Sequence, residues 1–400
     1  MNSQVFHTTL TSTDLLIHQT LTYHTMQPVV KFSRKDPELF FQTLRERVNQ
    51  YFDQNDIKKT GNGLMYRKTI AMFAMYFVPF VIILTQTLPA WTVILLYFLM
   101  GIGLSGIGLS VMHDANHGSY SESSWINRLM AHSMTIIGGS PFTWKVQHNF
   151  LHHTYTNIYE LDEDIDDKPF LRLSPHGELK SYHRFQHHYA MFLYSLATIS
   201  WILMKDFKQM VHYHREGLTQ KCGFKPTRET IFLIGTKILY VMYAVVLPIA
   251  LGVAWWAVLI GFVLMHMLAG VVITTIFQLA HVVEGPEHFT PEKTGTMENT
   301  WAIHQLKTTA NFARNNWFIT WFVGGLNFQI EHHLFPHVCH VHYKKISEIV
   351  KKTAQECNLS YFEHQTFTKA VASHLRVLKS LGNDTVLEFG QEHQVSGQKV

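Results

Sequence analysis

The chain has 400 residues, a length that allows one large unit or two or three domains. Only 16% of the residues are charged and 47% are hydrophobic, a balance shifted towards membrane proteins. The formal net charge of +4 suits basic loops beside an anionic membrane face, but it is too small to indicate nucleic-acid binding. The three scattered cysteines form no CxxC pair, which argues against a disulfide framework or a thiolate metal site.

The N-terminal segment, residues 1–60, is polar and is expected to lie in the cytosol, with residues 1–25 disordered. No apolar core follows a basic start, so no cleavable signal peptide is expected. From Asp36 to Asp53 the apolar residues recur at helical spacing. This pattern predicts an amphipathic helix with a stripe of Leu39, Phe40, Leu44, Val48 and Phe52.

Four long apolar runs follow, the first two without any charged residue, and each is sufficient to cross a hydrocarbon core of about 30 Å. They cover about residues 70–87, 90–112, 231–250 and 253–280, and proline or glycine turns the chain within each pair. The shorter apolar segment Tyr189–Met204 predicts an interfacial helix. The expected fold is therefore all-α and membrane-integral, with four transmembrane helices in two hairpins capped by a cytosolic helical domain. This membrane domain covers residues 61–352, and residues 353–400 are expected to form a cytosolic tail.

Lysine and arginine are absent from the turns near 86–91 and 248–252 but frequent before the first run and between the second and third. The positive-inside rule therefore predicts that both termini and the long loops are cytosolic. A helix rising about 1.5 Å per residue from Ala90 to His117 would be about 40 Å long. Its C-terminal end would stand above the bilayer on the cytosolic side.

Histidine is unusually frequent, with 27 residues against 29 for Asp and Glu together. Residues three or four apart share a helix face, and neutral imidazole is a common ligand for iron, zinc, copper and nickel. His153, directly after His152, is expected to be a ligand that points elsewhere. Three clusters on one membrane side predict a site for one or more metal ions; the alternative is a set of polar surface histidines. The clusters are His113 and His117; His148, His152 and His153; and His332 and His333, with Gln329 one turn earlier.

Several residues near the clusters have roles that depend on their place beside the predicted ligands. His281 ends the fourth run at the expected height of the clusters and is predicted to be an eighth ligand, whereas His304 is equally compatible with a structural role. Asp114 is predicted to orient a ligand histidine, as carboxylates often do. The acidic run 162–167 is most simply a solvated loop, and its alternative is hydrogen bonding to the second cluster. The remaining histidines are expected at the surface or behind the ligands: His132, His183, His187, His188, His212, His214, His337, His340 and His342.

The order His-x3-His, His-x3-His-His and Gln-x2-His-His, interrupted by a pair of spans, resembles the membrane fatty acid desaturase family. The segment Gly324–Pro336 resembles the third histidine box of its front-end group, the delta-5 and delta-6 enzymes, which insert a double bond between an existing one and the carboxyl end. The resemblance runs from about Lys31 to Lys352 and is closest to bacterial acyl-CoA desaturases of the linoleoyl-CoA type. It implies location in the bacterial inner membrane.

The resemblance also implies a non-haem centre of two iron ions. Gln329 stands where other desaturases have a histidine, so it is expected to bind weakly or through water. Relatives with that histidine have an asparagine one turn before the ligand on the fourth span; this chain has Phe277 there, so the contact of that asparagine with the metal site is not expected. Carried over by position, the ligands are His113, His117, His148, His152, His153, His281, His332 and His333.

The implied reaction forms a cis double bond in a fatty acyl chain from dioxygen and two electrons. The chain has no His-Pro-Gly-Gly haem motif, so a separate donor, a ferredoxin or a small cytochrome, is expected. An unactivated methylene offers no polar handle, so an apolar tunnel must position it. The candidates for that tunnel are Trp144, Gln147 and Trp321, for which ordinary packing is an equal alternative.

Two other functions compete with this prediction. A membrane diiron hydroxylase or ketolase would use the same oxidant, and its product would be an alcohol or ketone instead of an alkene. A histidine-rich metal transporter would need ligands at mid-membrane, but His266 is the only histidine well inside any predicted span.

Overall fold

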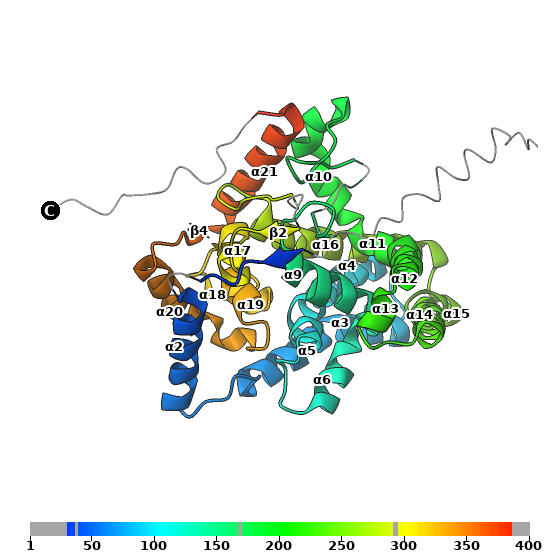
Figure 1. Ribbon diagram of the computed structural model, residues 1–400. Helices are drawn as coiled ribbons and strands as arrows, with labels where there is room; N and C mark the ends of the chain where they lie inside the picture. The colour runs from blue at the N-terminus through cyan, green and yellow to red at the C-terminus, as the bar shows by residue number, and fades with distance from the viewer. Residues whose placement is uncertain (1–29, 37–38, 166–167, 169, 291–294, 386–400) are drawn as a thin grey trace, which may run out of the picture.

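The computed structural model describes residues 30–36, 39–165, 168, 170–290 and 295–385, so the prediction for residues 1–25 lies outside it. Within these residues the chain is mainly helical (Figure 1), as predicted from the sequence. Two small parallel sheets tie distant segments together. In the first, β1 (Lys31–Phe32) pairs with β2 (Thr296–Met297); in the second, β3 (Ala310–Phe312) pairs with β4 (Phe362–His364).

Among the described residues, four helices are long and apolar enough to cross a membrane, and each overlaps one of the four predicted runs, although the first and third begin several residues earlier than predicted. They are α3 (Gly63–Thr85), the continuous helix Ala90–Asn116, the continuous helix Pro226–Ala250 and α16 (Trp255–His281). The second contains α4 (Ala90–Gly106), the π-helix η1 (Ile107–Met112) and α5 (His113–Asn116). The third contains α14 (Pro226–Val241), η5 (Met242–Val246) and α15 (Leu247–Ala250).

Helix α4 lies at the centre of this group and packs against both α3 and α16. Its small residues allow the close approach, since a Cβ on Gly103 would lie only 2.9 Å from the Cα of Tyr76. Tyr76, Tyr97 and Met265 are fully buried where the three helices meet. The close packing fixes the C-terminal ends of α4 and α16 relative to each other.

The loops between and after the spanning helices form the predicted helical cap. Between the second and third spans lie α6 (Ser124–Ala131), α7 (Ser133–Ile136), α8 (Pro141–Trp144), the π-helix η2 (Lys145–His152), α9 (His153–Tyr155), η3 (Ser181–Phe185), α10 (Gln186–Ser195), α11 (Ala197–Ser200), η4 (Trp201–Lys205), α12 (Asp206–Arg215) and α13 (Leu218–Lys221). After the fourth span lie α17 (Trp301–Thr308), α18 (Trp317–Phe322), α19 (Gln329–Leu334), η6 (His340–His342), α20 (Tyr343–Glu356) and α21 (Phe367–Asn383).

The predicted N-terminal helix is present as α2 (Phe40–Gln54), which lies beside α20 (Figure 1). The side chains of Phe40, Leu44 and Val48 are buried against α20 and the segment around α19, as their spacing predicted. Leu39 differs, because it precedes the helix and its side chain is 57% exposed. The segment therefore braces the third histidine cluster from outside.

The C-terminal helix α21 packs along α10 and the end of α16 (Figure 1). The ring of His374 bridges these elements: its Nδ1 lies 2.7 Å from the carbonyl oxygen of Val282 and its Nε2 lies 2.9 Å from the hydroxyl of Tyr194. The single helix predicted for 189–204 is instead divided into α10, α11 and η4, with a break at Leu196.

Candidate metal centre

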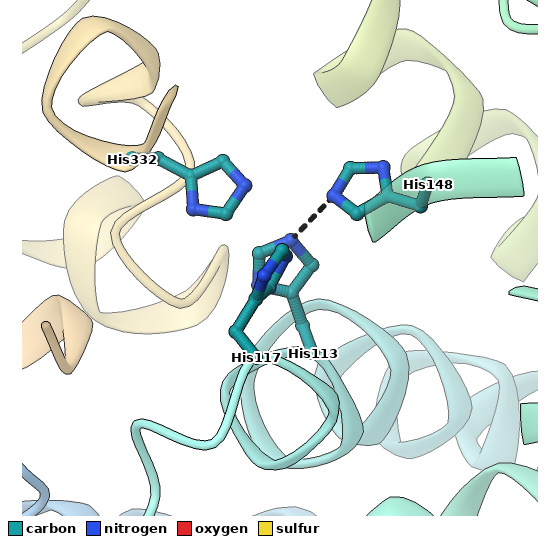
Figure 2. A group of neighbouring side chains, drawn as sticks. All are labelled: His113, His117, His148 and His332. Atoms are coloured by element: carbon teal, nitrogen blue, oxygen red, sulfur yellow. Dashed lines mark hydrogen bonds between the residues drawn. The ribbon is translucent and has the colours of Figure 1, made fainter. Parts of the chain in front are cut away.

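The histidine clusters and His281 lie on or beside five helical segments that the fold brings together. His113 begins α5 and His117 follows it, the second cluster lies on η2 and α9, the third lies on α19, and His281 ends α16. All eight predicted ligand histidines are buried, none more than 6% exposed. Figure 2 shows the rings of His113, His117, His148 and His332 converging from three different elements.

These histidines form two neighbouring groups. His113, His117, His148 and His332 can each offer a nitrogen within 4.8 Å of the others, and His152, His281 and His333 form a second group by the same measure. His153 lies between the groups: its Nε2 is 3.0 Å from Nε2 of His332, and its ring stacks on that of His333 with centroids 4.5 Å apart.

The nitrogen separations fit ligands of a shared ion. The Nε2 atoms of His113 and His148 are 3.2 Å apart, as are those of His153 and His148. Two nitrogens bound about 2.1 Å from one ion, at right angles, would lie about 3.0 Å from each other. The donor set therefore has the spacing and chemistry of a histidine-bound transition-metal site.

In the second group, the other nitrogen of each ring is anchored to the protein. Nδ1 of His152 lies 3.0 Å from both oxygens of Asp162, Nδ1 of His281 lies 3.0 Å from the Thr308 carbonyl, and Nδ1 of His333 lies 2.8 Å from Oε1 of Gln305. The Nε2 atoms of these three rings are buried and have no hydrogen-bond partner in the described part of the chain. Metal-bound histidines show this pattern, because the anchored Nδ1 orients Nε2 towards the ion.

The electrostatic environment keeps most of the rings neutral. Burial, followed by repulsion among neighbouring imidazoles, holds the pKa values of His117, His153, His332 and His333 well below the ordinary value. Burial likewise lowers the pKa of His148 to about 3, despite its contact with Asp164. A neutral imidazole has a free lone pair for a metal ion, so these rings are ready to act as ligands.

His152 is the exception. Burial opposes its positive charge, but Asp162 and Asp164 outweigh that effect and raise its pKa to about 9. The two carboxylates thus favour positive charge at this point of the site. A proton would supply that charge in the free protein, and a bound cation would supply it in the loaded site.

The π-helix η2 explains how three histidines of the second cluster reach one site. His153 was expected to point elsewhere, as it would in an α-helix with 3.6 residues per turn. The i→i+5 bonds of a π-helix take more residues per turn, so the fifth residue returns to nearly the same face. His148, His152 and His153 therefore all face the centre, and the expectation for His153 was wrong.

The acidic run after the second cluster is not the solvated loop that was expected. Asp162 is fully buried, accepts a hydrogen bond from the backbone nitrogen of Asn157 (2.9 Å) and holds His152. Asp164 lies 3.8 Å from Nδ1 of His148 and accepts a hydrogen bond from Gln147. The alternative, contact with the second cluster, is thus correct for these two residues; positions 166 and 167 lie outside the described residues.

Asp114 connects the first cluster to more distant residues. Its Oδ1 is 3.8 Å from Nδ1 of His113, while its Oδ2 accepts hydrogen bonds from Nδ1 of His340 (2.7 Å) and Sγ of Cys339 (3.0 Å). Nε2 of His340 in turn lies 2.6 Å from Nζ of Lys68 in α3. A buried chain of polar groups therefore runs from the first spanning helix to the first cluster.

The third cluster is held by a tight turn and by Asn311. Gly324 and Gly325 have φ angles of +65° and +68°, a conformation that other residues rarely adopt. Asn311 accepts from the backbone nitrogen of Ile330 (2.9 Å) and donates to Oε2 of Glu331 (2.8 Å), so α19 is fixed at its first turn.

Known proteins resemble this chain along most of its length. Residues 89–365 match the family described as "Fatty acid desaturase". The sn-1 linoleoyl-lipid 6-desaturase of Synechocystis is 38% identical across 88% of this chain and 98% of its own length, and that of Arthrospira platensis is 37% identical across 86% and 92%. The acyl-lipid (8-3)-desaturase of Physcomitrium patens is 32% identical across 88% and 74%. The chain belongs to the fatty acid desaturase family.

Gln329 and His304, the two residues whose roles the sequence left open, lie in different surroundings in the desaturase. Gln329 is buried, and its Nε2 has no hydrogen-bond partner in the described part of the chain. His304 lies outside the two groups, with its Nε2 2.7 Å from the Thr156 carbonyl oxygen and its ring between those of Phe32 and Phe289, which indicates a structural role.

The three tunnel candidates lie in three different environments. The ring of Trp144 is 4.4 Å from that of His148, so it lies directly beside the first group. Gln147 is held between Asp164 and Gln209 in the network behind the second cluster. Trp321 lines a separate pocket between α3 and α18.

Sequence reasoning missed Gln305 and Lys68 as contributors to the desaturase site. Gln305 lies one residue after His304, on the α17 turn that faces His333, and Lys68 lies 272 residues from its partner His340. A buried lysine in the first turns of a spanning helix is a weak signal that a partner exists, but it does not name that partner.

Proposed function

We propose that this desaturase places a cis double bond at carbon 6 of a linoleoyl-type chain carried by a membrane lipid, using two iron ions, dioxygen and two electrons. The observation that carries the proposal is the pair of adjoining buried histidine groups, and in the second of them anchored Nδ1 atoms leave the Nε2 atoms without a partner in the described part of the chain. The position and the lipid carrier follow the names of the cyanobacterial relatives, whereas the sequence alone left acyl-CoA and acyl-lipid both open as substrates.

His113, His117, His148 and His332 would hold one iron, His152, His281 and His333 the other, and His153 lies near both. When bound, the iron pair supplies the oxidising power that removes hydrogen from two neighbouring unactivated methylenes. Asp162 and Gln305 keep the rings of His152 and His333 in the tautomer that leaves Nε2 free. Gln329 stays a proposed weak or water-mediated ligand.

The chain's own task is to position and shield the methylenes. Trp144 is beside the first group, and the ring of Phe277 lies 5.6 Å from that of His148, so both offer an apolar wall next to the reacting bond. Contact with flat apolar side chains fixes depth and orientation without a polar handle. An apolar wall also excludes water from the oxidising site.

We further propose that the boxes and both termini face the cytosol of a bacterial cell, with a separate ferredoxin or small cytochrome as donor. The lysine- and arginine-free turns at the other ends of the spanning helices support this orientation.

Expression in a host with defined fatty acids tests the reaction. Cells supplied with linoleic acid should accumulate an 18-carbon acid with a new cis double bond at carbon 6, located by mass spectrometry of a suitable derivative. An alcohol or ketone without an alkene would contradict the proposal and favour a hydroxylase or ketolase. A new double bond at another carbon would keep the desaturase and overturn the position.

A further inference from the structure

A pocket of about 540 Å³ lies between the start of α3, α18 and the start of α20. Its lining includes Arg67, Lys68, Arg314 and Lys344, together with Trp317 and Trp321, and none of the residues that line it is acidic. We call it the basic pocket. A cavity of this size accommodates a small charged group, and the cationic side chains favour an anion.

Much of the positive charge in the basic pocket is not matched by carboxylates. Arg67 and Lys344 are exposed and form no ion pair within the described residues. Lys68 is only 5% exposed and its ammonium contacts Nε2 of His340, so it reaches the carboxylate of Asp114 only through that ring. Arg314 is paired with Glu363 at 3.0 Å, yet its Nε is buried without a partner in the described chain. An anionic group in the pocket would offset these buried charges.

The exposed surface around the basic pocket is apolar and aromatic. Trp317 and Phe318 of α18 are 77% and 55% exposed, and no residue of α18 is buried. Leu64, at the start of the spanning helix α3, is 57% exposed. Tryptophan and basic residues gather at the head-group level of a bilayer, so this arrangement fits a lipid head group better than a carrier dissolved in water.

The basic pocket is also close in structure to the first histidine group. His340 lines the pocket and donates to Asp114, which adjoins His113. On the other wall, Trp321 lines the pocket, and the next residue, Phe322, accepts a hydrogen bond at 3.5 Å from Ser110 in η1, three residues before His113. A head group held here would thus be linked to His113 through the side chains of His340 and Asp114.

We propose that the basic pocket binds the phosphate of a phospholipid substrate and thereby sets the distance from the acyl ester to the histidine groups. This inference rests on the proposed function, in which the double bond is counted from the carboxyl end. A fixed phosphate would hold the ester at one depth, so the same number of methylenes would separate it from the metal centre in every turnover.

The test compares the double variant Arg67→Gln/Lys344→Gln with wild type in lipid nanodiscs. Substrates are linoleoyl-phosphatidylglycerol, a neutral linoleoyl galactolipid and linoleoyl-CoA. Because the variant removes two of the cations that face the phosphate, the ratio of kcat/KM for the phospholipid to that for the galactolipid should fall by about tenfold or more. The matched control is Lys225→Gln/Arg228→Gln, two exposed cations at the start of the spanning helix α14, which should leave the ratio unchanged.

A binding measurement separates recognition from turnover. Metal-free wild-type protein purified in detergent should retain phosphatidylglycerol, measured as lipid phosphorus per chain, and the Arg67→Gln/Lys344→Gln variant should retain several-fold less. An unchanged ratio and unchanged retention would overturn the basic pocket while leaving the desaturase intact. A loss seen only with linoleoyl-CoA would assign the phosphate to CoA and overturn the lipid source. Absence of any desaturated product from the wild type, with phospholipid still retained, would count against the proposed function and not against the pocket's affinity.

Discussion

At the scale of single residues, the site depends on which nitrogen of each histidine is tied to the protein. Nδ1 of His333 lies 2.8 Å from Oε1 of Gln305, whose oxygen also accepts from Thr156 at 2.9 Å. An amide oxygen accepts hydrogen bonds and cannot donate one, so Nδ1 of His333 carries the proton and Nε2 carries the lone pair. A neutral glutamine thus determines the tautomer of a proposed ligand.

Replacing Gln305 by leucine should lower iron content and desaturation by about 10–100-fold, the usual cost of losing such an anchor. Gln305→Glu is the matched control, because a carboxylate still accepts from Nδ1 and should keep most of the iron. Iron per chain and product per cell are the two readouts. Equal iron content in wild type and Gln305→Leu would contradict the role given to Gln305.

Replacing His333 by alanine removes a proposed ligand outright. We expect no new double bond in cells that make His333→Ala, while the protein still appears in the membrane fraction at the wild-type level. His212→Ala, at an exposed histidine on α12, serves as the control and should retain full activity. If His333→Ala yields the same product as wild type, His333 must be removed from the ligand set.

At the scale of elements, the orientation of α19 depends on the turn that precedes it. Gly325 has a φ angle of +68°, and a Cβ there would lie 2.7 Å from Cβ of His340. Alanine would therefore add a backbone cost of about 1–2 kcal/mol and a clash with the residue that holds Asp114. Gly325→Ala should lose most of its iron and activity, whereas Gly235→Ala, with open space around it, should lose neither. Full iron loading of Gly325→Ala would show that the turn is not decisive.

The docking of α21 should depend on pH through His374. Burial lowers the pKa of this ring to about 4, against 6.5 for an ordinary histidine, although its bond to the Val282 carbonyl opposes the shift. Between these values the undocked state binds more protons than the docked state, so acid favours undocking. Hydrogen exchange in residues 367–383 should therefore rise as the pH falls from 6.5 to 4, relative to the intrinsic rate. His374→Asn should weaken that dependence; an identical profile for the variant would exclude His374 as its cause.

Most elements were predictable because their signals are local. The apolar runs predicted the four spanning helices, and the spacing of Phe40, Leu44 and Val48 predicted α2. The π-helix η2 was not predictable, because its i→i+5 bonds leave no periodic mark in so short a segment. It is also the reason that His153 joins His148 and His152 on one face.

The site was predictable as a set of histidines but not as a network. Asp162 lies only ten residues from His152. A run of acidic residues nevertheless predicts a solvated loop unless the residue that the carboxylate contacts is known. The contact of Lys68 with His340 and of Gln305 with His333 joins segments 272 and 28 residues apart. Such pairs depend on tertiary packing, which no local pattern encodes.

At the scale of the whole molecule, the three histidine clusters and His281 must all lie on one side of the bilayer to form one site. The turns near Thr87 and Gly252 lie at the opposite ends of the spanning helices. Thr87→Cys should react with a membrane-impermeant thiol reagent added outside intact cells, after the native cysteines are replaced by serine. Lys58→Cys, before α3, should react only after the cells are opened. The reverse labelling would invert the proposed topology.

The most direct test of the central claim is the metal content of the purified protein. The two histidine groups predict two iron ions for each chain, measured by elemental analysis on protein that retains desaturase activity. The His333→Ala variant should hold less iron. Fully loaded, active protein that carries zinc alone, or only a single metal ion for each chain, would contradict a pair of irons held by these histidines.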